Sequence, residues 1–321
     1  MAITAKYLEK GRCVNSEPVD ESKYAAFVNR TQIAARPMSA FPWPTGATKV
    51  FAVIGDPIAH SLSPVLLNAA FLALKLDAVY VALSVQREQL HGAVRGIRSL
   101  GVAGVSVTMP HKESIMVELD KLTDRARKLN SVNCVYWEDG ELVGDSTDGP
   151  AFVASLEEEI GAPIRGKSVM VCGTGGAARA IVVALSEAGA GAIVVVGRRA
   201  EAVERLVGLG GLMTRAGTAD EARDCEILVN ATNVGMSGTE GEGKSPIPAA
   251  FIQSGHFVYD IVYHPLATPL LRDALTAGAE AANGLGMLVH QAARAFWIWT
   301  GEEAPLDIMF HVARSRAEVA R

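Results

Sequence analysis

The chain is poor in cysteine, and it carries no excess of positive charge. Its 321 residues include four cysteines, which are far apart, form no C-x-x-C pair and have no histidine at metal-ligand spacing. This pattern argues against a disulfide framework and a metal site, and it favours buried thiols in a reducing compartment. The net charge of −5 offers no basic surface for nucleic acid. We therefore expect no metal ion and no nucleic-acid partner.

Long apolar runs are also missing. No stretch approaches the roughly 20 residues that cross a bilayer, so we expect no membrane partner. Residues 1–12 lack the continuous apolar core of a secretory signal, which predicts a cytoplasmic protein. The hydrophobic fraction of 49% over 321 residues is nevertheless enough for two domains, each with its own core.

The most informative stretch begins at residue 169. An apolar run over 169–172 leads through a glycine-rich turn into the apolar segment 180–185, which predicts a buried strand, a tight turn and a helix. Gly173 permits the sharp turn, Gly175 lets the backbone approach a pyrophosphate, and Ala178 lets the helix pack closely. The free N–H groups at the start of the helix then face the phosphates. We interpret this stretch as a dinucleotide site, with a purely structural turn as the alternative.

The next strand indicates which dinucleotide is bound. Residues 192–196 predict a strand that ends in Gly197-Arg198-Arg199, and no carboxylate follows until Glu201. A carboxylate in this region would bind a ribose 2′-hydroxyl, whereas guanidinium groups suit a 2′-phosphate. Arg198 and Arg199 therefore favour NADP over NAD; a solvated basic turn is the alternative.

The first third of the chain has two unlike parts. Residues 21–35 predict a helix and the prolines at 37, 42 and 44 a linker, so that residues 1–48 form an N-terminal extension with no assigned chemistry. Beyond it, strands at 50–54, 79–83 and 103–107 alternate with helices, the second of them over 87–100. This alternation predicts a parallel sheet. Two polar segments, 60–64 and 108–112, follow strands and are therefore expected at one rim.

One of these segments contains a lysine suited to proton transfer. Pro110 fits the first turn of a helix and would place Lys112 in that turn, where a cation needs a compensating carboxylate. Asp148 is the candidate, since it follows a predicted hairpin over 132–143 that turns at Asp139-Gly140. A Lys and an Asp on one cleft can relay a proton, whereas a lone Lys is usually a solvated surface residue.

The rest of the chain completes a two-domain α/β protein. A connecting helix is predicted over 149–160, strands over 227–229 and 257–262, and helices over 285–299 and 306–320. We expect a substrate domain with a parallel sheet over 49–148, completed by the C-terminal helices over 283–321. A Rossmann-type dinucleotide-binding domain over 149–282 lies between them.

Seven short motifs together resemble the shikimate dehydrogenase family, whose members act on shikimate or quinate. Any single match could arise by chance, but their order and spacing are specific, and the resemblance covers nearly everything from Val50 onward. The motifs are Gly55-Asp56-Pro57-Ile58-Ala59-His60-Ser61-Leu62-Ser63-Pro64, Val107-Thr108-Met109-Pro110-His111-Lys112, Ser131-Val132-Asn133, Ser146-Thr147-Asp148-Gly149, Gly173-Thr174-Gly175-Gly176-Ala177-Ala178-Arg179, Asn230-Ala231-Thr232 and Asn283-Gly284-Leu285-Gly286-Met287-Leu288-Val289-His290-Gln291-Ala292.

The resemblance implies an NADP-dependent oxidoreductase that interconverts 3-dehydroshikimate and shikimate in the chorismate pathway of aromatic amino acid biosynthesis. It implies that Lys112 and Asp148 are the catalytic acid–base pair. The residues that it assigns to the substrate carboxylate are Ser61, Ser63 and Tyr263, and those that it assigns to the hydroxyls are Thr108, Asn133, Asp148 and Gln291. The cofactor residues expected from the motifs and the resemblance are Gly173, Thr174, Gly175, Gly176, Ala177, Arg198, Arg199, Thr232, Ile261 and Gly284. The small-molecule substrate would be bound by a monomer or a homodimer.

Several positions depart from the family pattern and keep alternatives open. Ser106 and Ser146 stand where members that make shikimate usually have Asn, and the NADP loop usually reads Asn-Arg-Thr or Asn-Arg-Ser rather than Gly197-Arg198-Arg199. One alternative is a paralogue acting on quinate or an aminoshikimate, with NAD in place of NADP. Ser63 argues against quinate, because quinate-using relatives tend to have threonine there. Another alternative is a non-catalytic nucleotide or metabolite sensor, which the presence of both Lys112 and Asp148 disfavours.

Overall fold

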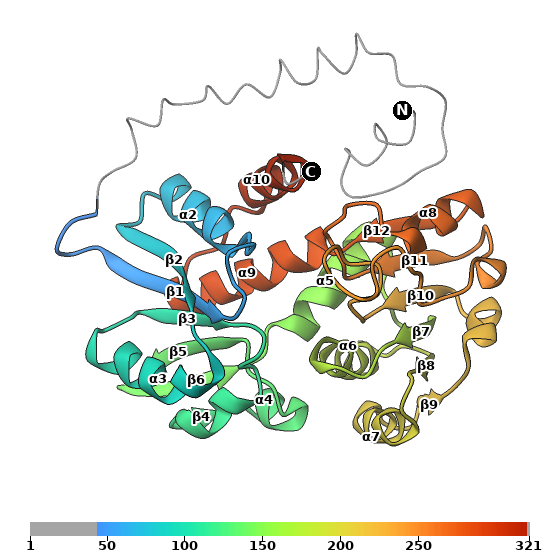
Figure 1. The fold of residues 1–321 in the computed structure, drawn as a ribbon, viewed down its shortest axis with the longest axis horizontal. Helices are drawn as coiled ribbons and strands as arrows, with labels where there is room; N and C mark the ends of the chain where they lie inside the picture. The colour runs from blue at the N-terminus through green and yellow to red at the C-terminus, as the bar shows by residue number, and fades with distance from the viewer. Residues whose placement is uncertain (1–43, 320–321) are drawn as a thin grey trace, which may run out of the picture.

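The computed structural model describes residues 44–319, and this part of the chain forms two six-stranded sheets that stand side by side (Figure 1). Helix α9 (Leu285–Thr300) crosses the middle of the molecule between them. The α/β class with two domains, expected from the alternation of strands and helices, is confirmed. The helix expected over 21–35 and the proline linker after it lie outside the described residues.

The first sheet is built from the strands before residue 146 and has the order β2-β1-β3-β5-β6-β4. Its strands are β1 (Lys49–Gly55), β2 (Ala78–Ser84), β3 (Gly104–Val107), β4 (Lys121–Leu122), β5 (Cys134–Glu138) and β6 (Glu141–Asp145). Five strands share one direction, while β5 is antiparallel to both of its neighbours. The sheet is therefore mixed rather than purely parallel. The reason is the turn Asp139-Gly140, in which both residues have positive φ, because a two-residue turn joins only antiparallel strands.

Both faces of this sheet are covered by helices. Phe51 and Val53 of β1 pack in one apolar cluster with α2, α9 and α10, whereas Ala52 and Ile54 belong to a cluster on the opposite face with α3. This alternation is the period of two that a strand imposes. The helices concerned are α2 (Ser63–Ala73), η3 (Arg87–Gln89), α3 (Leu90–Ser99), η4 (Ser114–Glu118), α4 (Asp124–Leu129) and α10 (Leu306–Val319).

The second sheet is fully parallel and has the order β12-β11-β10-β7-β8-β9. Its strands are β7 (Ser168–Cys172), β8 (Ala192–Val196), β9 (Thr214–Ala216), β10 (Ile227–Asn230), β11 (Phe257–Asp260) and β12 (Glu280–Asn283). Numbered along the chain, this is the order 3-2-1-4-5-6 of a Rossmann fold. The order reverses between β7 and β10, and in such sheets ligands bind in the crevice beyond the carboxyl ends of the strands at that point.

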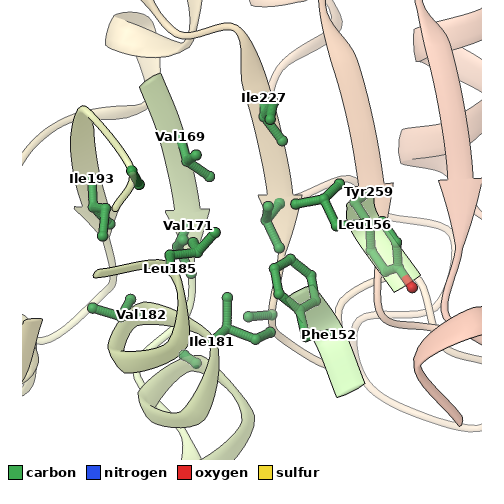
Figure 2. Close-up of a cluster of buried hydrophobic side chains, with 14 of the residues drawn as sticks. Phe152, Leu156, Val169, Val171, Ile181, Val182, Leu185, Ile193, Ile227 and Tyr259 are labelled. Atoms are coloured by element: carbon green, nitrogen blue, oxygen red, sulfur yellow. The ribbon is translucent and has the colours of Figure 1, made fainter. Parts of the chain in front are cut away.

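Helices on both faces bury this sheet. They are α6 (Gly176–Glu187), α7 (Ala200–Gly210), η5 (Ala219–Asp224), η6 (Ala249–Phe251) and α8 (Pro269–Thr276). Figure 2 shows one of the two cores, in which Ile181, Val182 and Leu185 of α6 lie close to Val169 and Val171 of β7. The apolar helix that the sequence predicts after the glycine-rich turn is thus the one that packs on β7.

Helix α5 (Asp148–Ile160) connects the two sheets. Its first residue, Asp148, follows the last strands of the first sheet, while Phe152 and Leu156 are buried in the core of the second (Figure 2). The helix ends at Gly161, which has a φ of 64°, as the predicted stop requires.

One local prediction is wrong, and two others differ from the structure only in detail. No helix begins at Pro110: Lys112 lies in a turn between β3 and η4, so the helix-dipole reason for its partner does not apply. The helix expected over 87–100 begins as the short 3₁₀ segment η3, and the strand expected over 257–262 ends at Asp260. Neither α8 nor β12 is predicted from the sequence, because each is short.

Within residues 44–319, no helix is both long and apolar enough to cross a membrane. In the same range, no group of three or more His, Cys, Asp or Glu side chains could hold a metal ion.

Candidate active site

Lys112 and Asp148 form an ion pair at the rim of the first sheet. The Nζ atom of Lys112 lies 2.6 Å from Oδ2 of Asp148, although the residues are 36 positions apart. The Lys112 side chain is 25% exposed and that of Asp148 is 8% exposed, so a substrate can reach the ammonium group while the carboxylate is buried behind it. Asp148 is the first residue of α5, where a carboxylate interacts favourably with the helix dipole.

One backbone hydrogen bond and one side-chain contact hold the turn that carries Lys112 in place. The carbonyl oxygen of Lys112 accepts a hydrogen bond of 2.8 Å from the N–H of Val132. His111 is fully buried, and its Nε2 lies 2.6 Å from the carbonyl oxygen of Val85, at the end of β2. Both ties belong to the first sheet, so they fix Lys112 relative to that sheet.

The second oxygen of Asp148 also has a partner. The Nδ2 atom of Asn133 donates to Oδ1 of Asp148 over 2.7 Å and to Oγ1 of Thr147 over 2.9 Å. In return, the N–H of Thr147 donates to Oδ1 of Asn133 over 2.7 Å. All three residues are buried, so each hydrogen bond compensates for lost contacts with water. This network orients the carboxylate toward Lys112.

The other residues predicted for the substrate lie in loops at the ends of the strands, at the start of α2 and on α9. Thr108 follows β3, and its N–H donates to the carbonyl oxygen of Ile54 in β1, which places it beside the start of the loop that leads to the serines. Ser61 accepts a hydrogen bond from the N–H of Ser63 over 3.3 Å. The carbonyl oxygen of Gln291 accepts from Oγ1 of Thr147 over 3.4 Å, which brings α9 to the Asp148 network.

Tyr263 reaches the first sheet from the end of β11. It packs against the apolar cluster formed by β1, α2 and the C-terminal helices. Burial raises the pKa of its phenol, so the hydroxyl keeps its proton at neutral pH and can donate to a carboxylate.

The glycine-rich turn has the form that a dinucleotide requires. Gly173 has a φ of 128°, and a Cβ at this position would lie 2.7 Å from the carbonyl oxygen of Ala231. Only glycine therefore fits between β7 and β10 at the reversal of strand order. Helix α6 begins directly after Gly175, and among the described residues no side chain caps its first turn. Its free N–H groups are available for a pyrophosphate.

A cavity of about 580 Å³ adjoins this turn. It is lined by Glu113, Lys128, Leu129, Asn130, Thr174, Gly175, Gly176, Arg179, Arg199, Ala202, Arg205, Leu206 and Leu209. Within residues 44–319, neither Arg199 nor Arg205 forms an ion pair with a carboxylate, so both guanidinium groups are available to bind an anionic group. The residues present therefore fit NADP. The N–H groups at the start of α6 can bind the pyrophosphate, and Arg199 and Arg205 in the same cavity can bind a 2′-phosphate. Arg198 is exposed and does not line this cavity.

The three remaining cofactor candidates, Thr232, Ile261 and Gly284, follow β10, β11 and β12. The backbones of Ile261 and Gly284 are in close contact, because a Cβ on Gly284 would lie 1.9 Å from the carbonyl oxygen of Ile261. Thr232 is held by Asn230, whose Oδ1 accepts from the Thr232 hydroxyl over 2.6 Å.

Buried Asp260 ties these loops together. Its carboxylate accepts hydrogen bonds from Asn230, from the N–H of Val262 and from Thr268, over 2.9, 3.0 and 2.7 Å. Burial nevertheless raises the pKa of Asp260 from its ordinary value of 3.8 to about 6, while the three donors act in the opposite direction.

Four residues of the site were not predicted from the sequence, namely Thr147, Arg205 and the pair Glu113–Arg179. Thr147 and Arg179 stand inside motifs quoted above, and Glu113 directly follows Lys112, so position in the motif was the available signal. For Arg205 there was none, because a charged residue in a helix is usually solvated.

Two family models match the chain. Residues 53–135 match the shikimate dehydrogenase substrate binding domain. Residues 284–312 match the shikimate 5′-dehydrogenase C-terminal domain.

Known proteins resemble the chain over most of its length. The NADP-dependent shikimate dehydrogenase of Geobacter metallireducens is 44% identical over 276 residues, which cover 83% of this chain and 96% of that protein. Shikimate 5-dehydrogenase of Thermus thermophilus, solved with NADP(H) and shikimate, has a TM-score of 0.77 at 37% identity and covers 84% of this chain and 100% of that one. Quinate dehydrogenase of Corynebacterium glutamicum, solved with NAD, has a TM-score of 0.76 at 26% identity, covering 84% and 99%.

Proposed function

The chain belongs to the shikimate dehydrogenase family, and we propose that it interconverts 3-dehydroshikimate and shikimate with NADP through the pair Lys112–Asp148. It is an NADP-dependent oxidoreductase of the chorismate pathway. The observation that supports the assignment of Lys112 is the 2.6 Å contact of its ammonium group with the buried carboxylate of Asp148. A solvated surface lysine would have no such partner.

Lys112 handles the proton of the reaction. When the C3 carbonyl of 3-dehydroshikimate is reduced, Lys112 Nζ donates a proton to the oxygen, and in the reverse direction it takes the proton of the C3 hydroxyl. Asp148 holds the ammonium group through Oδ2, and Asn133 holds Asp148 through Oδ1. A positioned acid–base group of this kind typically contributes about 10²–10⁴-fold in rate.

We assign the substrate contacts to the same rim. Ser61, Ser63 and the neutral phenol of Tyr263 donate to the ring carboxylate, for which three hydroxyl donors are well suited. Thr108, Asn133, Asp148 and Gln291 contact the ring hydroxyls. A site built to hydrogen-bond hydroxyl groups rejects analogues that lack them, because its own buried polar groups would then lose their partners.

NADP, when bound, supplies or accepts the hydride. The turn of Gly173, Thr174, Gly175, Gly176 and Ala177 would hold its pyrophosphate at the start of α6, and Arg198 and Arg199 would hold the 2′-phosphate. Thr232, Ile261 and Gly284 would line the nicotinamide side of the crevice. NAD remains the alternative cofactor, and the comparisons favour NADP.

The proposal also covers the domain division, the oligomeric state and the location of the protein. We assign residues 49–148 and 283–321 to the substrate domain, 149–282 to the NADP domain and 1–48 to an extension, with a monomer or homodimer as the active form. A cytoplasmic location agrees with the free, buried thiols of Cys134, Cys172 and Cys225, while Cys13 lies outside the described residues.

The test is an assay of reduced-nicotinamide absorbance with shikimate and quinate, each against NADP and NAD, and Lys112→Ala as the control variant. Reduction of NADP by shikimate alone, lost in the variant, is the expected result. Preference for quinate or NAD would support the paralogue, which the comparisons do not favour. Nucleotide binding without turnover of any pair would contradict an enzymatic role and leave a sensor.

A further inference from the structure

We propose that the ion pair between Glu113 and Arg179 is a positioning bridge that sets the place of Lys112 relative to the dinucleotide turn. Glu113 directly follows Lys112 in the turn before η4, whereas Arg179 lies near the start of α6, in the NADP domain. Nη2 of Arg179 contacts Oε1 of Glu113. The inference rests on the proposed role of Lys112 as the proton donor.

The pair adjoins the dinucleotide turn. Glu113 and Arg179 both line the cavity that Thr174, Gly175 and Gly176 border. A Cβ on Gly176 would lie 3.8 Å from Nη2 of Arg179 and 3.8 Å from Oγ of Ser131, a residue of the first domain. The two domains therefore approach each other at the point where the pyrophosphate is expected.

Arg179 depends on Glu113 for its compensating charge. Its side chain is only 21% exposed, and its Nε atom is buried without a hydrogen-bond partner in the described part of the chain. A guanidinium group removed from water in this way depends on its remaining partner, because an unpaired buried charge is costly. Glu113 is the carboxylate that provides this compensation, and it is 58% exposed.

The bridge ties the turn of Lys112 directly to the helix that begins at the cofactor turn. The contacts of Lys112 with Val132 and of His111 with Val85 hold the turn on the first sheet. The Lys112–Asp148 pair reaches the second domain only through α5, whose Gly149 packs against Ala180 of α6. The Glu113–Arg179 pair adds a direct contact to α6 near its first turn. Proton transfer must coincide with hydride transfer, and displacement by about 1 Å can cost about 10²-fold in rate. Loss of the bridge should therefore lower kcat, while KM for shikimate, set within the first domain, changes little.

A second ion pair across the same interface provides a matched control. Lys128 of α4 and Glu187, the last residue of α6, lie 3.3 Å apart, with side chains 44% and 55% exposed. This pair also joins the substrate domain to α6, but at the opposite end of that helix from the dinucleotide turn. A merely structural docking role would be shared by both pairs, whereas a positioning role belongs to Glu113–Arg179 alone.

The experiment compares kcat and KM of Glu113→Ala, Arg179→Ala and their double variant with those of Glu187→Ala, at saturating NADP. Glu187 is the control because it does not line the cavity beside the dinucleotide turn, whereas Lys128 does. We expect kcat to fall about 5–10-fold in each of the first two single variants and no further in their double variant, given a partly exposed pair that positions a reacting group. The charge-swapped variant Glu113→Arg/Arg179→Glu should recover part of kcat. Glu187→Ala should stay within about 2-fold of wild type.

Hydrogen exchange of the amides over 109–118 tests the bridge without turnover. Exchange should be faster in Glu113→Ala than in wild type and unchanged in Glu187→Ala, because the bridge restrains this turn. If wild type did not oxidise shikimate with NADP, the proposed function would fail, and the exchange rates would still decide the bridge. Unchanged exchange in Glu113→Ala, additive losses of kcat, or an equal loss of kcat in Glu187→Ala would each overturn the proposal.

Discussion

The Nδ2 atom of Asn133 lies 2.7 Å from Oδ1 of Asp148, so the carboxylate oxygen that does not face Lys112 is held as firmly as the one that does. Asn133 precedes β5 and Asp148 begins α5, and their contact is buried. Asn133 thus orients the carboxylate that holds Lys112, the residue that we propose as the proton donor.

Replacing Asn133 by Ala should lower kcat/KM for shikimate about 10–100-fold, because a hydrogen bond to a charged group typically contributes about 1.5–3 kcal/mol. The carboxylate would keep Lys112 as a partner but lose its fixed direction. Steady-state kinetics with shikimate and NADP provide the measurement. Asn68→Ala, which removes a different amide in α2, is the control, and an equal loss there would point to general destabilisation.

Lys112→Arg should be nearly as inactive as Lys112→Ala, with kcat reduced by about 10²–10⁴-fold. Arginine preserves the positive charge beside Asp148, yet it does not release its proton in proteins. The comparison therefore separates proton transfer from electrostatic attraction. Binding of NADP, followed by fluorescence titration, should stay close to that of wild type. Substantial activity in Lys112→Arg would show that charge alone is sufficient.

Arg199→Gln should weaken NADP binding about 10-fold and NAD binding by less than about 2-fold, since an anion contact of this kind contributes about 1.5 kcal/mol or more. Arg199 lines the cavity beside the dinucleotide turn, whereas Arg198 is exposed outside it. Arg198→Gln should accordingly have the smaller effect. Dissociation constants of both nucleotides for both variants test this, and equal effects on NADP and NAD would refute a 2′-phosphate role.

Gly284→Ala should unfold the cofactor side of the crevice or abolish NADP binding. The added Cβ would lie 1.9 Å from the carbonyl oxygen of Ile261, and backbone atoms cannot move away cheaply. Gly208→Ala, in α7, is the matched control, because no atom lies within 4 Å of its added Cβ. That variant should be about 0.5–1 kcal/mol more stable, as expected for Gly to Ala within a helix. Urea unfolding of the two variants gives the comparison.

The free energy of unfolding should depend on pH through Asp260. Since burial raises its pKa from 3.8 to about 6, the folded state binds its proton more tightly than the unfolded state between these values. This contribution is therefore fully present below about pH 4 and is lost as the pH rises through about 6, a change of roughly 3 kcal/mol. Asp260→Asn should remove this decrease in the free energy of unfolding. The free energy of unfolding of the variant, relative to that of wild type, should therefore increase from pH 4.5 to pH 7.

The measurement is urea unfolding of wild type and variant at both pH values. The difference between them is what matters, because carboxylates with lowered pKa, such as Glu226, change the stability of both proteins in the opposite direction. The exposed residue Asp224, changed to Asn, is the control. A wild-type-to-variant difference that is the same at both pH values would contradict the prediction.

The local patterns predicted most of the elements, and their errors have a common cause. Strands with a run of β-branched residues, such as β8, and helices with a long apolar face, such as α9, were predicted within a few residues. The single opposed strand β5 was implied by the turn at Asp139-Gly140, although the sheet was expected to be parallel. Short elements such as β12 were not predicted, because three or four residues are too few to show a periodic apolar pattern.

The prediction of Asp148 as the partner of Lys112 was correct, but the reason given for it was not. No helix dipole acts on Lys112, since it lies in a turn. The pair forms because β3 and the β5–β6 hairpin are neighbours in one sheet and deliver both residues to the same rim. Sequence order alone does not contain that adjacency.

The sequence by itself determined the α/β class, the glycine-rich turn and the residue types available for proton transfer and anion binding. These depend on apolar period, backbone freedom and side-chain chemistry, which act over a few residues. The tertiary structure alone decided that Asn133 holds Asp148, that Arg199 lines the cavity while Arg198 does not, and that Arg179 meets Glu113 66 residues away. Such contacts follow from how two sheets and their helices pack, because packing brings together side chains whose separation along the chain carries no signal.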